Sequence, residues 1–409
     1  MQTSYSGKSL SVWTIVKDDG LVLLCLLISI THLFFQWNEI FFAIPLLILV
    51  IRQNHSQQCK IMTFWLALFS VLYLMGYAMN AGVESRTLYI IYLFPPIYFM
   101  AGAYLGRKYY TNDKVLIFVL FAFVLMYAAY DLGQILYSVF KNDGEVLLSR
   151  QILDEEGNKT RNATGYAIVM SVLIAGIAFI FSPKHESFNR WFRLVSIFTS
   201  LLALYGMIMI VTRTSVVEAL VVLVFSLYMA LVNRYKKNVA LVVLFAIIVL
   251  MVYASYVYDI SSLSNIVEAF EERNSNDSNV SQAGGRTELW TSALESLIHN
   301  PLGTSTGRTN KGTYCHNMWL DVGVSAGWLP FLILLFFSLN NIRHSFRLLK
   351  NPNLHYYTRI YFFAMFIVLI LSCFVEPVLD NVYRHFLVYV FFCGIVSEMT
   401  SKGSMKTHI

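Results

Sequence analysis

Long apolar runs, separated by short polar connections, make up most of this chain of 409 residues. Most of them come near the ~20 apolar residues that a helix needs to cross a bilayer. Twelve such runs occur, at 20–36, 38–51, 61–79, 88–105, 115–135, 164–182, 194–211, 215–233, 239–257, 317–340, 360–375 and 384–398. Backbone groups in lipid must be bonded within their own segment, and the runs lack the alternating pattern of barrel strands. The pattern therefore predicts an all-α, polytopic membrane protein with about twelve transmembrane helices.

Two polar stretches interrupt this pattern, a long one at about 258–316 and a shorter one at about 141–163. The predicted organisation is helices one to nine in 1–257, including the shorter loop, the long loop in 258–316, helices ten to twelve in 317–398 and a tail in 399–409. Only the second half carries the long loop, whereas the halves of twelve-helix transporters often match. This asymmetry weakens the interpretation as a carrier without removing it.

Composition and charge agree with a membrane protein, because 57% hydrophobic and 13% charged residues exclude a soluble globular domain. With a cytoplasmic N-terminus, 19 of the 30 lysines and arginines fall on the cytoplasmic side. Eight of the other 11 lie in the two long loops, where the positive-inside rule says least. We therefore expect both termini to be cytoplasmic and both long loops external. The net charge of +6 favours anionic lipid headgroups and requires no nucleic-acid partner.

The N-terminus and the cysteines exclude several other classes of protein. The first 19 residues are polar and of mixed charge, and no cleavage pattern follows, so we expect the first helix to be retained. Among the five cysteines only Cys315 faces outward, which leaves it without a disulfide partner. The histidines and cysteines show no zinc spacing, and the external loops contain no acidic pair for a divalent ion. We expect chemistry that needs no metal.

Within the long loop, residues 286–299 have the spacing of an amphipathic helix. Its apolar positions are Leu289, Trp290, Ala293, Leu294, Leu297 and Ile298. Pro301 ends it, because proline cannot continue the hydrogen-bond ladder. The segment is too short and too polar to span a bilayer, so we expect it to lie at the interface or to pack on the bundle.

Two arginines are candidates for binding an anion. Arg286 follows Gly284-Gly285 and begins the predicted helix, where free backbone N–H groups and the positive end of the helix dipole favour phosphate. Arg213 lies in the short external turn Thr212-Arg213-Thr214, at a depth where an unpaired arginine is unfavourable. The alternatives are a solvated loop arginine for Arg286 and a side chain that extends to the interface for Arg213.

His316 lies at the start of the predicted helix that begins near Asn317, and a histidine there can accept a proton from a sugar hydroxyl. Asn317 is a candidate for binding substrate and also suits a helix cap. Asp321 can orient the His316 ring only if His316 precedes the helix proper, because five residues correspond to about 140° around a helix. Further external cations that suit an anionic substrate are Arg161, Arg308, Lys311 and Arg384.

These motifs together carry a family resemblance. Thr-Arg-Thr at 212–214 is followed by Gly-Gly-Arg-Thr-Glu-Leu-Trp at 284–290, Asn-Pro-Leu-Gly at 300–303, Tyr-Cys-His-Asn-Met-Trp-Leu-Asp at 314–321 and Gly327. In this order, and within a bundle of about twelve helices, the chain resembles the O-antigen ligase and O-antigen polymerase superfamily of bacterial inner membranes. The topology extends over the whole chain, and the specific motifs occupy about 211–330.

The resemblance implies a glycosyltransferase that needs neither metal nor cofactor and uses a glycan on undecaprenyl pyrophosphate at the periplasmic face. Carried onto the matching positions, Arg213 and Arg286 bind the pyrophosphate and His316 is the base that activates the acceptor hydroxyl. Arg161, Arg308 and Asn317 are further substrate-binding candidates. The implied partners are the lipid-linked oligosaccharide, membrane lipids and a chain-length regulator.

Three functions remain open at this point. A polymerase joins lipid-linked repeat units and is favoured by the His-Asn-Met-Trp-Leu-Asp motif and by the 25 tyrosines and 31 phenylalanines, which suit stacking on sugars. A ligase transfers the finished glycan to lipid A-core. A flippase or other carrier would place charges such as Asp131 and Glu218 inside the bundle. Glu376 and Asp380, four residues apart, share one helical face at the external mouth or form a solvated helix end.

Overall fold

The computed structural model describes residues 12–31, 38–80, 88–142, 147, 151–153, 159–181, 190–232, 286–304 and 314–405. They form a helical bundle and one hairpin of two short strands. The elements are α1 (Val12–Ile30), α2 (Asn38–Ile51), α3 (Gln57–Asn80), η1 (Leu88–Leu93), α4 (Pro95–Lys108), η2 (Tyr110–Asn112), α5 (Asp113–Lys141), β1 (Gln151–Leu153), β2 (Lys159–Asn162), α6 (Ala163–Ser171), η3 (Val172–Phe179), α7 (Arg190–Met209), α8 (Arg213–Val232), α11 (Arg286–His299), α12 (Met318–Ala326), α13 (Trp328–Lys350), α14 (Tyr356–Val375), α15 (Val378–Asn381) and α16 (Tyr383–Met405).

Within these residues, five helices are long and apolar enough to cross a membrane. They are α3, the continuous stretch Tyr110–Lys141 that contains α5, α7, α8 and α14. The other predicted runs within the described residues also fall on helical elements, but these are shorter, interrupted or more polar. The run at 239–257 lies outside the described residues. The helical class of the prediction is confirmed, while the number of twelve spans stays a prediction.

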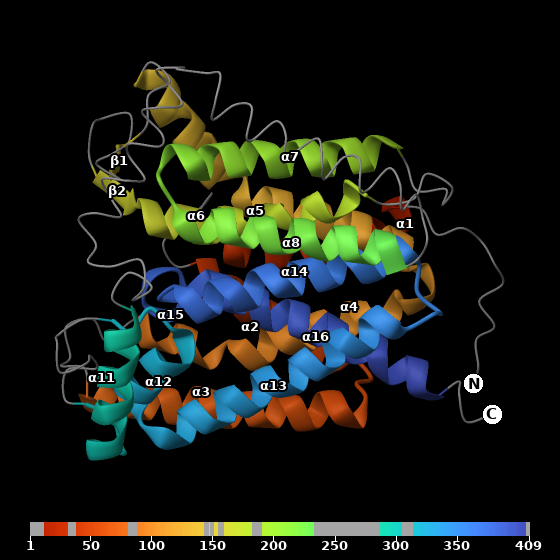
Figure 1. Cartoon of the computed structure of the whole chain (residues 1–409). Coiled ribbons are helices and arrows are strands. Elements are labelled where there is room, and N and C mark those ends of the chain that lie inside the picture. Colours follow the sequence, from red (N-terminus) through yellow and green to blue (C-terminus); the bar gives the residue numbers. More distant parts are fainter. Residues whose placement is uncertain are drawn as a thin grey trace.

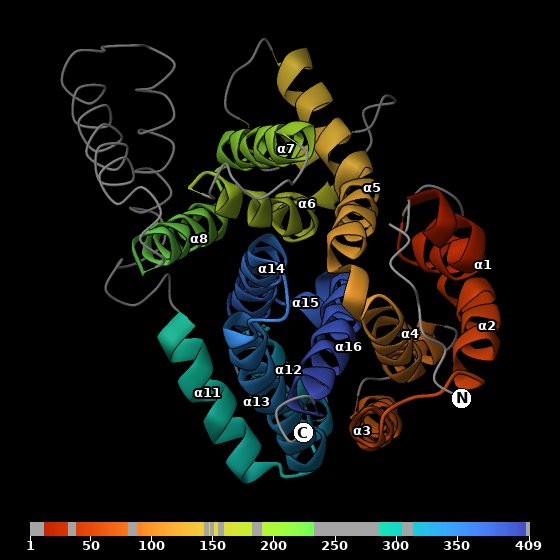
Figure 2. The same ribbon diagram turned by 90° about the vertical axis from the view of Figure 1, so that its right-hand side faces the viewer.

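The long helices lie roughly side by side, as Figure 1 shows, and Figure 2 views them nearly along their axes. In Figure 2, α6, α7 and α8 form one side of the bundle and α3 and α13 the other, with α14 and α16 between them. Helices α1 and α2 lie beyond α4, and α11 lies at the outer edge. The site described below therefore has α14 at its centre, with α8 and α11 on either side.

Helices α4 and α16 approach most closely at glycines. A Cβ atom added at Gly102 would overlap the carbonyl oxygen of Phe391, and one added at Gly394 would overlap that of Phe99. Gly106, one turn along α4, lies against Ile395 in the same way. Small residues at such spacing let helix backbones meet in a membrane, where the hydrophobic effect does not drive helices together.

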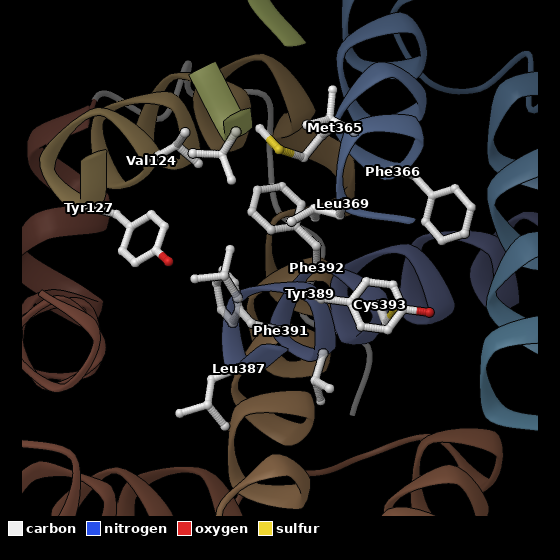
Figure 3. Close-up of a cluster of buried hydrophobic side chains, with 14 of the residues drawn as sticks. Val124, Tyr127, Met365, Phe366, Leu369, Leu387, Tyr389, Phe391, Phe392 and Cys393 are labelled. Atoms are coloured by element: carbon white, nitrogen blue, oxygen red, sulfur yellow. The ribbon is translucent and has the colours of Figure 1, made fainter. Parts of the chain in front are cut away.

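The interior is filled by aromatic and aliphatic side chains of α5, α14 and α16. Figure 3 shows Tyr127, Leu369, Phe391 and Phe392 among the buried side chains of this cluster. Phe123 of α5 packs on Phe391 with ring centroids 5.2 Å apart. This packing fixes α14 against its neighbours and thereby places the residues that follow its last turn.

One predicted helix is divided in two. The apolar run at 317–340 was expected to be continuous, but α12 ends at Ala326 and α13 begins at Trp328. Gly327 lies between them at φ 90°, a conformation open to glycine, and an added Cβ would overlap the carbonyl oxygen of Pro301. The expectation of one continuous helix is therefore wrong, because the segment that follows α11 packs into the corner at Gly327.

Several chain connections gather at one end of the bundle. Figure 1 shows α11, α15 and the β1–β2 hairpin at this end, on the left of the view. The backbone N–H of Leu147 donates to the carbonyl oxygen of Met209, 2.8 Å away, so the segment before β1 meets the turn between α7 and α8. The described parts of both predicted external loops thus lie at the same end of the molecule.

Candidate functional site

Three helix starts and one helix end meet at this end of the bundle. Arg213 is the first residue of α8, Arg286 is the first residue of α11, and His316 lies two residues before the start of α12. Glu376 directly follows the last residue of α14. The three residues that carry the predicted chemistry come from distant parts of the sequence, and the fold brings their helix ends together.

The carboxylate of Glu376 is the centre of this arrangement. Its Oε1 accepts a hydrogen bond of 2.6 Å from the hydroxyl of Thr214 and lies 3.4 Å from Nη2 of Arg286. Its Oε2 lies 3.9 Å from Nδ1 of His316. The Glu376 side chain is 11% exposed, whereas the His316 side chain is 40% exposed. The site thus has a buried acidic centre, with the histidine at its accessible edge.

The backbone is strained at two points of this site. Among the described residues, the non-glycine positions with positive φ are Val211, at 54°, and His316, at 52°. A β-branched residue in this region is an outlier, and such strain persists only where the surrounding structure enforces it. Val211 shapes the turn that presents Arg213, and His316 turns its own side chain out of the path of α12.

Asp321 holds the strained segment through its backbone. Its carboxylate oxygens accept from the N–H of Cys315, at 2.7 Å, and from the N–H of Asn317, at 3.3 Å. These residues flank His316, so Asp321 positions the loop, while the carboxylate that faces the His316 ring is that of Glu376. His316 does precede the helix proper, as the orienting role of Asp321 required, but the contacts of Asp321 are to backbone rather than to the ring.

Asn317 caps α12 and ties it to α14. Its side-chain oxygen accepts from the backbone N–H of Leu320 at 3.2 Å, and its Nδ2 donates to the carbonyl oxygen of Phe374 at 3.1 Å. Both bonds are structural, and the residue is buried. Asn317 therefore fixes the start of α12 beside the end of α14, and its role in binding substrate stays a prediction.

Burial and the neighbouring groups act in opposite directions on the pKa of Glu376. Burial raises the pKa of Glu376. His316, Arg286 and Thr214 together lower it by more than burial raises it, so the pKa of Glu376 lies below its ordinary value. Glu376 is thus an anion near neutral pH, held among cationic and hydrogen-bond-donating groups.

The other predicted cations are Arg161, Arg308, Lys311 and Arg384. Arg161 is on β2, which leads into α6 at this end, but its side chain is outside the described residues, as are Arg308 and Lys311. Arg384 is buried and its Nη1 donates to the carbonyl oxygen of Thr31 at 3.1 Å, beyond the end of α1. Arg384 therefore satisfies a helix end, which explains its burial.

Aromatic rings border the polar centre. Trp290 packs edge-on against Phe374 with ring centroids 5.2 Å apart, and the Trp319 ring lies tilted against Phe374 with centroids 6.2 Å apart. The Trp290 indole N–H donates to the carbonyl oxygen of Cys315 at 3.0 Å, so this ring is fixed to the segment before His316. Phe374 remains 45% exposed, which leaves an aromatic surface beside Glu376.

Glu376 is the residue whose central place was not predicted. Sequence reasoning allowed a solvated helix end there, and the available signal was an acidic residue next to Pro377 directly after an apolar run. In the part of the chain that the structure describes, no three His, Cys, Asp or Glu side chains form a group able to hold a metal ion. The described chemistry is that of two arginines, a histidine and a carboxylate.

Comparison with known proteins agrees with the family suggested by the motifs. Residues 198–335 match a family model described as O-antigen ligase. The matched segment contains Arg213, Arg286 and His316, and it ends before Glu376. No curated protein matches the chain.

Proposed function

We propose that the chain is an O-antigen polymerase, a metal-independent glycosyltransferase, because its residues 198–335 match a family model described as O-antigen ligase. It joins oligosaccharide repeat units carried on undecaprenyl pyrophosphate, at the periplasmic face of a bacterial inner membrane, with both termini cytoplasmic. The observation that carries the proposal is the meeting of Arg213, Arg286 and His316 at one end of the bundle.

The residue types suit this reaction. The acceptor hydroxyl attacks the anomeric carbon of the donor sugar, a new C–O bond forms, and the bond from that carbon to the pyrophosphate oxygen breaks. His316 takes the hydroxyl proton. The pyrophosphate leaves with an added negative charge, which Arg286 and Arg213 and the starts of α8 and α11 stabilise without a metal ion.

A ligase is the second candidate, because the matching family model is described as O-antigen ligase. The donor and the bond that breaks are the same, and only the acceptor changes from a lipid-linked repeat unit to lipid A-core. The half-exposed ring of Phe374 beside the site serves stacking on a sugar in either case.

The lipopolysaccharide of a deletion strain separates these functions. Loss of a polymerase leaves a single repeat on the core, whereas loss of a ligase leaves bare core and accumulates lipid-linked polymer. A ladder identical to that of the parent strain would contradict both and favour a carrier or another role.

We predict that His316→Ala abolishes glycan transfer while the protein still inserts and folds. The reason is that the imidazole is the partly exposed proton acceptor of the site, and its loss removes no core packing. The measurement is the ladder of the deletion strain complemented with the variant, with membrane content followed by immunoblot. Arg286→Ala and Arg213→Ala should give the same loss, and a wild-type ladder from His316→Ala would exclude this residue as the base.

A further inference from the structure

Glu376 occupies the place where the proposed donor's pyrophosphate would bind. Its Oε1 lies 3.4 Å from the Arg286 guanidinium, between the starts of α8 and α11, where backbone N–H groups and helix dipoles favour an anion. An internal carboxylate therefore fills an anion site that the chain itself builds.

The contacts of Glu376 are unequal. Only the bond from the Thr214 hydroxyl, at 2.6 Å, is short. Hydrogen bonds between charged groups usually lie at about 2.7–2.9 Å. The separation of 3.4 Å from Arg286 exceeds this range, and the separation of 3.9 Å from His316 is too long for a hydrogen bond. Glu376 is anchored by Thr214 and lies between Arg286 and His316 without fully engaging either.

A second observation concerns the histidine. Nδ1 of His316 is buried and has no hydrogen-bond partner, although the Oε2 of Glu376 is the carboxylate oxygen that faces it. A buried ring nitrogen without a partner is unfavourable, and a small movement of Glu376 toward His316 would provide the missing bond. Asp321 does not supply it, because its carboxylate is bonded to backbone N–H groups.

We propose that Glu376 is a displaceable placeholder that couples donor binding to activation of His316. In the free protein it partly neutralises Arg286. When pyrophosphate binds to Arg286, repulsion between the two anions drives the carboxylate onto Nδ1 of His316. There it fixes the ring so that Nε2 faces the acceptor hydroxyl, and it stabilises the imidazolium that forms on proton transfer. This inference rests on the proposed function for its substrate, and on the contacts of Glu376 for its mechanism.

The proposal predicts opposite effects of Glu376→Gln on binding and on turnover. The amide keeps the shape and the bond to Thr214 but no longer competes with an anion for Arg286, so inorganic pyrophosphate should bind about tenfold more tightly. The same amide stabilises the imidazolium poorly, so kcat should fall at least tenfold while the KM for the lipid-linked donor also falls. A residue that only supports the fold would instead raise KM as kcat falls.

The matched control is Glu288→Gln. Glu288 is exposed in the first turn of α11, two residues from Arg286, so this variant removes the same charge from the same helix start. Its pyrophosphate affinity and kcat should stay within about twofold of the wild type. If both variants bound pyrophosphate more tightly by the same factor, the effect would come from the general loss of negative charge, and the proposed role of Glu376 would be overturned.

Binding of inorganic pyrophosphate to purified protein in detergent keeps the two proposals separate. If the wild type transfers no glycan, the proposed function fails, yet the comparison of pyrophosphate affinity between wild type and Glu376→Gln still tests the placeholder. Unchanged or weaker binding by Glu376→Gln overturns it. Should that variant fold poorly, Thr214→Val gives a second test, because it removes the short bond that anchors Glu376. The carboxylate is then easier to displace, so the Thr214→Val protein should bind pyrophosphate more tightly than the wild type.

Discussion

At the scale of single residues, the candidate site uses backbone conformations that its side chains do not favour. His316 and Val211 both have positive φ, and each lies within two residues of a helix start. The carboxylate of Asp321 offsets the strain at His316 by accepting from the N–H groups on either side of it. The position of the proposed base therefore depends on a residue that does not contact its ring.

Replacing Asp321 tests this dependence. In Asp321→Ala, the buried N–H groups of Cys315 and Asn317 lose their acceptor, which should lower the free energy of unfolding by about 1–3 kcal/mol and lower transfer activity at least tenfold. Thermal unfolding in detergent and the rate of glycan transfer are the two measurements. Asp321→Asn keeps acceptor oxygen and should lie between the alanine variant and the wild type. A fully stable Asp321→Ala would show that these bonds do not hold the loop.

At the scale of elements, α11 shows that a correct helix prediction does not decide which side of the helix packs against the bundle. The helix covers 286–299, the predicted range. Its buried face includes Ser292, Ala293, Ser296 and Leu297, while Leu294 and Ile298 are exposed, so the apolar residues are divided between the bundle and the outside. Hydrophobic periodicity predicted the element, but the contact with α12 decided which apolar residues face inward.

Gly327, at the break between α12 and α13, should not tolerate a side chain. Gly327→Ala places a Cβ at φ 90° and against the carbonyl oxygen of Pro301, so it should destabilise the protein and displace α12, which carries the loop with His316. The expected result is a loss of at least about 2 kcal/mol in the free energy of unfolding, with reduced transfer activity.

Gly133→Ala is the control for that variant. Gly133 is exposed within α5, and an added Cβ would meet nothing within 4 Å. Alanine should there raise stability by about 0.5–1 kcal/mol, because glycine is less favourable inside a helix. If both variants behaved alike in thermal unfolding, the conformation at Gly327 would not be the cause.

At the scale of the whole molecule, the site lies at one end of the bundle and a different polar cluster at the other. Asn80, at the end of α3, donates to the carbonyl oxygens of Leu302 and Ser325 near the site. Ser56, directly before the start of α3, donates to Glu398 of α16, and the 24 residues of α3 separate it from Asn80 by about 36 Å along the helix. The two ends are therefore far enough apart to face opposite sides of a bilayer.

Thiol labelling tests the proposed orientation. We expect a membrane-impermeant thiol reagent to label Thr287→Cys from the periplasmic side, and to label Gln53→Cys only after the inner membrane is opened. Both positions are exposed, at opposite ends of the bundle, and the five native cysteines are buried, which keeps the background low. The reverse labelling pattern would place the site on the cytoplasmic side.

The sequence by itself determined the membrane class and most helix positions, and it singled out His316, Arg213 and Arg286 as candidate site residues. It could do so because the length of apolar runs and the patterns at helix starts are local properties of the chain. It also carried the family resemblance, since the motifs lie in order along it. Tertiary structure decided what local patterns cannot express. The break at Gly327 follows from packing of a distant segment, and the contact of Asp321 with backbone follows from a strained turn. Glu376 became the centre of the site because the end of α14 meets the starts of α8 and α11, a meeting between segments up to 162 residues apart in sequence.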